Sequence, residues 1–86
     1  MALPAVILTQ RQFVDGDSLG HCGGPFRMVW EVSVNGAIQL FGVGSGAEQS
    51  LTIGGVEAEV VEAHDAVTNR DSIAVSIGGA TWMLSL

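Results

Sequence analysis

Apolar and polar residues alternate on both sides of Gly78-Gly79, which predicts a tight β-hairpin near the end of the sequence. A two-residue glycine loop permits the positive-φ turns that match the twist of paired strands. Met83 falls on the outward face of this hairpin, and a one-residue slip would mix the two faces. Three cross-strand pairs are expected on the inward face: Ile77 with Ala80, Val75 with Trp82, and Ile73 with Leu84.

The same pattern recurs around Gly54-Gly55 and predicts a second hairpin. A two-residue loop again separates an apolar face from a polar one. The inward face receives Leu51, Ile53, Val56, Ala58 and Val60. The outward face receives Ser50, Thr52, Glu57 and Glu59.

Asn35-Gly36 marks another hairpin, and two registers compete for it. A two-residue loop would place Gln39 among the inward apolar residues. A three-residue loop over residues 34–36, with glycine in the left-handed position of a type I turn with a bulge, keeps the faces separate. We therefore expect the three-residue loop. Its register pairs Val32 with Ile38 and Trp30 with Leu40 inside, and Val29 with Phe41 outside.

A seventh strand is expected within residues 4–13. Val6, Ile7 and Leu8 are consecutive apolar residues there, and such a run is typical of a strand that is covered on both faces. Residues 15–25 hold four of the twelve glycines and predict an irregular loop.

Residues 56–67 also fit an amphipathic helix, because apolar residues recur there at helical spacing. The register set by the glycine turn favours a strand through about Val61, and the strand is our prediction. Ser45 and Glu48 match a capping box, which indicates one short helical turn before the second hairpin as an alternative to a loop.

These patterns predict an all-β fold of six to seven short strands in hairpins, with at most that one helical turn. Short strands joined by tight turns form a small barrel or a sandwich. With 86 residues and a mass of 8.9 kDa, the chain is expected to be a single all-β domain, residues 1–86, with one modest core.

The sequence has 9 acidic and 3 basic residues, and its net charge is -6. Nucleic-acid binding is not expected, because neutralising phosphates requires clustered Lys and Arg. No apolar run approaches the roughly 18 residues of a membrane span, and no targeting segment is recognisable. We expect a cytoplasmic protein, or one belonging to a particle assembled in the cytoplasm.

Cys22 is the candidate nucleophile, and it stands in a glycine-rich segment after His21. A catalytic thiolate needs a base or another group that lowers its pKa. Neighbouring side chains on an extended chain point apart, so His64 would have to be that base. The simpler interpretation, a small thiol without a role, is favoured, and no catalytic residue is assigned.

Two motifs match ligand loops only in part. Asp15 and Asp17 begin like a calcium loop, but Leu19 occupies the next ligand position. Residues 42–46 are rich in glycine like a phosphate loop, but no helix of sufficient length can follow them. We therefore expect neither a metal nor a cofactor.

Acidic residues gather between positions 57 and 65, where a solvated strand face is the preferred interpretation. The cluster comprises Glu57, Glu59, Glu62 and Asp65, together with His64. Trp30 and Trp82 are expected to pack in the core, with each indole N–H bonded to a carbonyl.

Only 14% of the residues are charged, and a second chain is expected to cover part of the apolar surface. We predict a non-enzymatic structural or interaction module that forms a homo-oligomer or a larger assembly with protein partners. A capsid-decorating or tail component of a virion is one such role. The expected interface residues are the outward Val29, Phe41 and Met83. The alternatives are an acidic inhibitor of a basic protein and, third, a thiol enzyme that uses Cys22.

Overall fold

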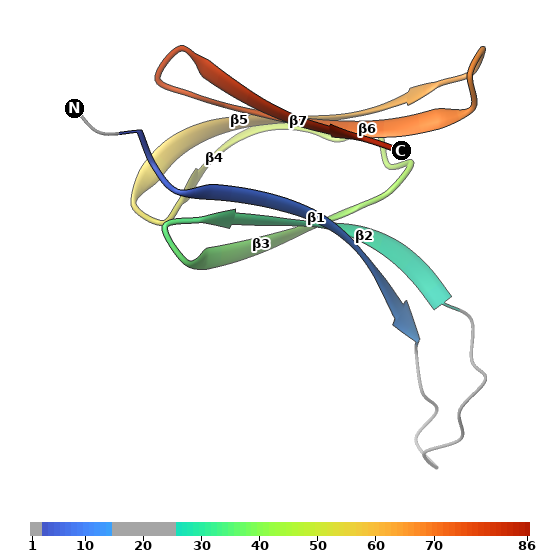
Figure 1. The fold of residues 1–86 in the computed structure, drawn as a ribbon, viewed down its shortest axis with the longest axis horizontal. Coiled ribbons are helices and arrows are strands. Elements are labelled where there is room, and N and C mark those ends of the chain that lie inside the picture. Colours follow the sequence, from blue (N-terminus) through green and yellow to red (C-terminus); the bar gives the residue numbers. More distant parts are fainter. Residues whose placement is uncertain (1–2, 15–25) are drawn as a thin grey trace.

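The computed structural model describes residues 3–14 and 26–86, and all regular structure in these residues is antiparallel β-strand (Figure 1). The described part contains no helix, so the predicted all-β class is confirmed. The strands are β1 (Val6–Val14), β2 (Phe26–Val34), β3 (Ala37–Gly42), β4 (Glu48–Ile53), β5 (Val56–Asp65), β6 (Arg70–Ile77) and β7 (Ala80–Ser85).

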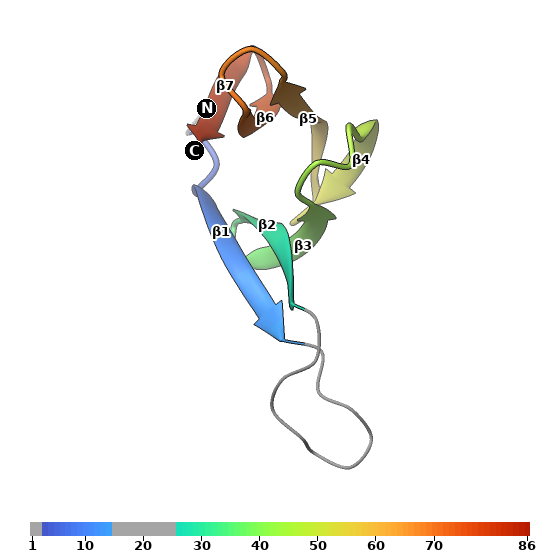
Figure 2. The ribbon, with the colours of Figure 1, turned by 90° about the vertical axis from the view of Figure 1, so that its right-hand side faces the viewer.

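The strands form two sheets that follow chain order, β1-β2-β3 and β4-β5-β6-β7. Figure 2 shows the sheets facing each other, with β1 beside β7 and β3 beside β4. The arrangement is a two-sheet sandwich, whose core is formed by inward side chains of both sheets. The fully buried side chains are Trp30, Val32 and Val34 from β2, Val60 from β5, and Ile73 and Val75 from β6.

The two Gly-Gly hairpins have the predicted registers. In the last hairpin, Val75 pairs with Trp82, and in the middle hairpin Leu51 pairs with Ala58. All four turn glycines have positive φ, as two-residue hairpin loops that match strand twist require. Turn chemistry and apolar alternation thus determine the same register in both hairpins.

The three-residue loop predicted at Asn35-Gly36 is wrong. The turn has two residues, with φ of 51° at Asn35 and 86° at Gly36, and Trp30 pairs with Phe41. Two positive φ values identify the type I′ turn that Asn-Gly favours. The turn therefore sets the register. Gln39 falls at an inward position of β3 in this register, but its side chain remains exposed, so no polar group is buried there.

This register reverses the faces of β3. Phe41 points into the core and is 5% exposed, so its predicted outward position is wrong. Val29 is outward by register, but it is only 7% exposed. The predicted apolar spot of Val29 and Phe41 therefore does not exist, and Ile38 and Leu40 are exposed on the outer face instead.

Three smaller expectations are also corrected. The N-terminal strand exists as β1, but only one of its faces is covered, because Ile7 is 64% exposed. β5 continues past Val61 to Asp65, which excludes a helix at residues 56–65. The capping-box turn does not form, because Glu48 begins β4 and the Ser45 hydroxyl accepts a hydrogen bond from the N–H of Ala47.

Candidate functional site

Glu62 is the only buried charged residue in the described part of the chain, at 2% exposure. It occupies the next inward position of β5 after Ala58 and Val60. The sequence interpretation placed Glu62 on a solvated face, and that placement is wrong. The signal was present, because the inward alternation of β5 reaches position 62 once the strand extends beyond Val61.

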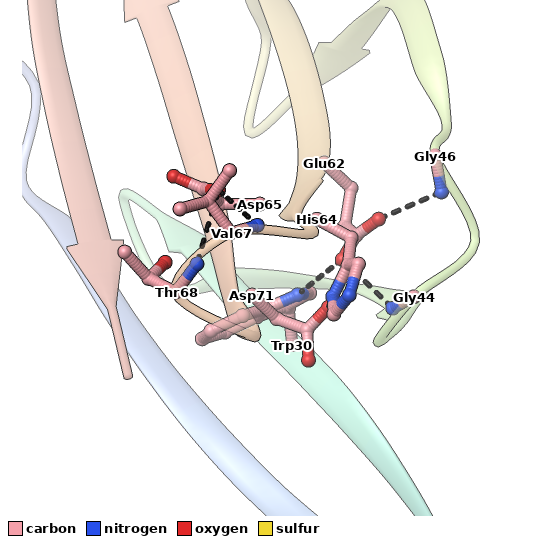
Figure 3. A network of polar contacts seen from close by, with 9 residues as sticks. All are labelled: Trp30, Gly44, Gly46, Glu62, His64, Asp65, Val67, Thr68 and Asp71. Carbon is pink, nitrogen blue, oxygen red and sulfur yellow. Dashed lines mark hydrogen bonds and ion pairs between the residues drawn. The ribbon is translucent and has the colours of Figure 1, made fainter.

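The Glu62 carboxylate receives three hydrogen bonds (Figure 3). The backbone N–H of Gly44 donates to Oε1 over 2.8 Å, and that of Gly46 donates to Oε2 over 2.7 Å. The indole Nε1–H of Trp30 donates to Oε1 over 3.4 Å. The expectation that this indole would meet a carbonyl is therefore corrected, although Trp30 is fully buried as predicted.

The loop between β3 and β4 has the local geometry of an anion-binding site. Gly44 and Gly46 have φ of 80° and 64°, and their N–H groups, two residues apart, converge on the two oxygens of one carboxylate. The anion here is the protein's own carboxylate. The N–H groups of Gly44 and Gly46 are already bonded to Glu62. The glycine-rich loop at residues 42–46 therefore offers these donors to no further anion, although it resembles a phosphate loop.

This network joins the two sheets. Trp30 comes from β2 and Glu62 from β5, while the glycine loop connects β3 to β4. The N–H of Glu62 also donates to the Ala47 carbonyl oxygen over 2.8 Å. Hydrogen bonds to a charged acceptor are stronger than neutral ones, so the network serves to hold the sandwich together at its β3–β4 side.

His64 and Asp71 form a cross-strand pair between β5 and β6 (Figure 3). His64 Nδ1 lies 2.9 Å from Asp71 Oδ1, and both side chains are partly exposed. His64 is thus engaged with a carboxylate. Its proposed partner Cys22 lies outside the described residues, as do His21, Asp15 and Asp17.

Asp65 stabilises the turn after β5. Its Oδ1 accepts hydrogen bonds from the N–H groups of Val67 and Thr68, over 2.9 and 3.3 Å. These backbone bonds favour the ionised carboxyl and lower the pKa of Asp65 below its usual 3.8. The role of this carboxylate is therefore local and structural.

The outer face of β4–β7 is polar around a shallow depression of about 630 Å³. Glu57 and Glu59 lie there on one strand and are exposed, as predicted. The hydroxyls of Ser76 and Thr81 bond to each other over 3.1 Å. Among the described residues, no three His, Cys, Asp or Glu side chains are placed to hold a metal ion.

The outer face of β1–β3 carries an apolar patch. Ile7 on β1 and Ile38 on β3 both align with Ser33 of β2, and they are 64% and 60% exposed. Leu40 lies two residues beyond Ile38 on the same face and is also exposed. We call Ile7, Ile38 and Leu40 the β1–β3 patch. The type I′ register of Asn35-Gly36 would have revealed it in the sequence.

A second apolar feature crosses the outer face of β4–β7. Val61, Ala74 and Met83 align on three neighbouring strands. Met83 is 67% exposed, in the outward position that the sequence predicted. We call these three residues the β5–β7 row. Of the three expected interface residues, Met83 is therefore accessible, whereas Val29 and Phe41 are buried.

Comparison with known proteins gave no match, since no family model, no curated protein and no solved structure matches the chain. Within residues 3–14 and 26–86, no helix is long and apolar enough to cross a membrane.

Proposed function

We propose that this protein is a non-enzymatic assembly module that associates with further copies of itself through the outer faces of its sheets. The β1–β3 patch carries the proposal. The side chains of Ile7, Ile38 and Leu40 lie outside the core, and all three are exposed on the outer face of one sheet. Clustered exposed apolar side chains on small proteins mark interaction sites more often than isolated apolar residues do.

The energetics favour covering this patch. Complete burial of an Ile or Leu side chain contributes about 1.5–3 kcal/mol, so covering these partly exposed side chains contributes about 1 kcal/mol each. A contact between two copies gains this energy without requiring a pocket. A low charge content and the absence of lysine suit a subunit of a larger particle, such as a capsid-decorating or tail component of a virion.

The titratable groups with defined partners support a structural role. Glu62 is bonded to backbone amides and an indole, and Asp65 is bonded to the amides of its own turn. His64 is paired with Asp71. Each of these groups has a partner within the fold, which supports a structural role for it.

Sedimentation velocity from low to high micromolar concentration tests the proposal. The wild-type protein should associate as its concentration rises, whereas Ile38→Glu should remain monomeric because it places a charge in the β1–β3 patch. Leu40→Glu should repeat this result. Val67→Glu is the matched control, because Val67 is 95% exposed in the turn after β5, and this variant should associate like the wild type.

Circular dichroism and thermal unfolding confirm that each variant is folded. A wild-type protein that remains monomeric throughout the series would overturn the proposal and leave binding of a basic partner as the alternative. Association of Ile38→Glu at the wild-type concentration would overturn it as well.

A further inference from the structure

The charges of the described residues are segregated between the two sheets. Strands β1–β3 contain two arginines and one carboxylate: Arg11, Arg27 and Glu31. Strands β4–β7 contain one arginine, Arg70, and six carboxylates: Glu48, Glu57, Glu59, Glu62, Asp65 and Asp71. The described strands β1–β3 therefore carry a net charge of +1 and the strands β4–β7 a net charge of -5, while Asp15 and Asp17, between β1 and β2 in the sequence, lie outside the described residues.

The outward positions show the same segregation. Arg11 and Arg27 lie at outward positions of β1 and β2. Arg11 Nε lies 2.6 Å from Glu31 Oε2, but its side chain is 59% exposed while that of Glu31 is 17% exposed. The opposite outer face presents the exposed carboxylates Glu48, Glu57, Glu59 and Asp65, together with the exposed Arg70, which pairs with Asp65 across the strands.

Each outer face also has exposed apolar residues among its charges. The β1–β3 patch lies on the arginine-bearing face. The β5–β7 row lies on the acidic face, where Val61 pairs with Glu48 across the strands. The two faces thus resemble each other in apolar content and differ in the sign of their charge.

We infer that the copies associate head to tail, with the outer face of β1–β3 of one copy against the outer face of β4–β7 of the next. This inference rests on the proposed self-assembly and specifies its geometry. Pairing two acidic faces would oppose carboxylates to carboxylates, and pairing two β1–β3 faces would bring together two surfaces whose described residues carry a net positive charge. Like charges across an interface are costly, whereas opposite charges guide association and fix register.

Head-to-tail contact leads to an open assembly. The two outer faces point in opposite directions from the sandwich (Figure 2), so every added copy presents a fresh face for the next one. A heterologous contact that does not close by rotation produces a filament or stack rather than a two-fold dimer.

The size of the faces predicts weak individual contacts. Strands of nine, nine and six residues, at about 3.3 Å per residue and about 4.8 Å spacing, give a footprint of roughly 380 Å². Two such footprints total roughly 760 Å², below the ~1,200–2,000 Å² of stable complexes. Assembly should therefore depend on concentration, and added salt should weaken it by screening the charges.

Complementary face variants test the inference. Ile38→Glu blocks the β1–β3 face and leaves the acidic face intact. Met83→Arg interrupts the β5–β7 row, adds a charge that repels Arg11 and Arg27, and leaves the β1–β3 face intact. Each variant alone should sediment as a monomer. An equimolar mixture should associate again, because the intact face of one variant then meets the intact face of the other.

The outcomes separate this inference from the proposed function. If Met83→Arg alone associates like the wild type, two β1–β3 faces pair with each other, and the head-to-tail geometry is wrong while self-assembly stands. A mixture that stays monomeric also overturns the geometry. A monomeric wild-type protein overturns both.

Discussion

Glu62 shows how a single buried charge can be accommodated in a small sandwich. Burial of an unpaired carboxylate is costly, and here two glycine amides and one indole N–H offset that cost. Removing the acceptor would leave the buried indole N–H of Trp30 without a partner and would remove the charged acceptor from the part-buried amides of Gly44 and Gly46. The network therefore depends on the carboxylate more than on any single donor.

Glu62→Ala should lower the free energy of unfolding by about 2–4 kcal/mol, because the buried indole N–H of Trp30 loses its acceptor, at about 1–3 kcal/mol, and the part-buried amides of Gly44 and Gly46 lose hydrogen bonds to a charged group. Glu62→Gln keeps one oxygen acceptor and should lose about 1–3 kcal/mol. Urea unfolding followed by tryptophan fluorescence measures both changes. Glu59→Gln, an exposed outward change on the same strand, is the control and should shift stability by less than about 0.5 kcal/mol. Equal stability of Glu62→Ala and this control would contradict the role of the network.

The lowered pKa of Asp65 predicts how the stability of the fold depends on pH. Because its folded-state pKa lies below the usual 3.8, ionisation of this carboxyl favours the folded state. Its stabilisation is fully present above the unfolded-state pKa and is lost as the pH falls through the folded-state pKa. A carboxyl ¹³C NMR titration should give a midpoint below 3.8 for Asp65. Asp65→Asn should remove this contribution to the acid dependence, and a midpoint at or above 3.8 would refute the assignment.

At the scale of strands and turns, the sequence predicts structure well where two signals agree. Around Gly54-Gly55 and Gly78-Gly79, the loop length and the apolar alternation demand the same pairing, and both registers are confirmed. At Asn35-Gly36 the two signals predict different registers, because the two-residue loop places the polar Gln39 at an inward position. Alternation favours the three-residue loop and turn chemistry the two-residue loop, and the positive φ of Asn35 shows that turn chemistry determines the register.

The Glu62 network was beyond reach from the sequence for a different reason. It requires the tertiary approach of Trp30, the glycine loop and β5, which lie far apart along the chain. A charged residue at an inward position of an alternating strand is the local sign of such a network. The exposed β1–β3 patch was missed only because the register of β3 was wrong.

The turn of the β4–β5 hairpin packs against the β2–β3 turn, and this contact requires glycine. A Cβ at Gly54 would overlap the carbonyl oxygen of Val34, whereas a Cβ at Gly55 would meet open space. Both positions have positive φ, which costs an alanine about 1–2 kcal/mol.

Gly54→Ala should therefore destabilise the fold by at least about 1 kcal/mol more than the matched variant Gly55→Ala, since only the former adds a steric clash to the backbone strain. Thermal unfolding of the two variants gives this comparison. Equal unfolding temperatures would mean that the two turns do not pack as closely as described.

At the scale of the whole molecule, the main feature is the difference between the two outer faces. Strands β4–β7 carry a net charge of -5 and strands β1–β3 a net charge of +1, and both outer faces expose apolar residues. The sequence has few charged residues and a mean hydropathy of +0.44, and exposed apolar residues on such a protein favour association at high concentration. Segregated charge then determines which faces meet.

Methyl and amide NMR spectra recorded over a concentration series test head-to-tail self-assembly most directly. Signals of Ile38 and Leu40 on one sheet and of Val61 and Met83 on the other should shift together as the concentration rises. Signals of the buried Ile73 should stay constant. Shifts confined to one sheet, or no shifts up to high micromolar protein, would contradict head-to-tail assembly.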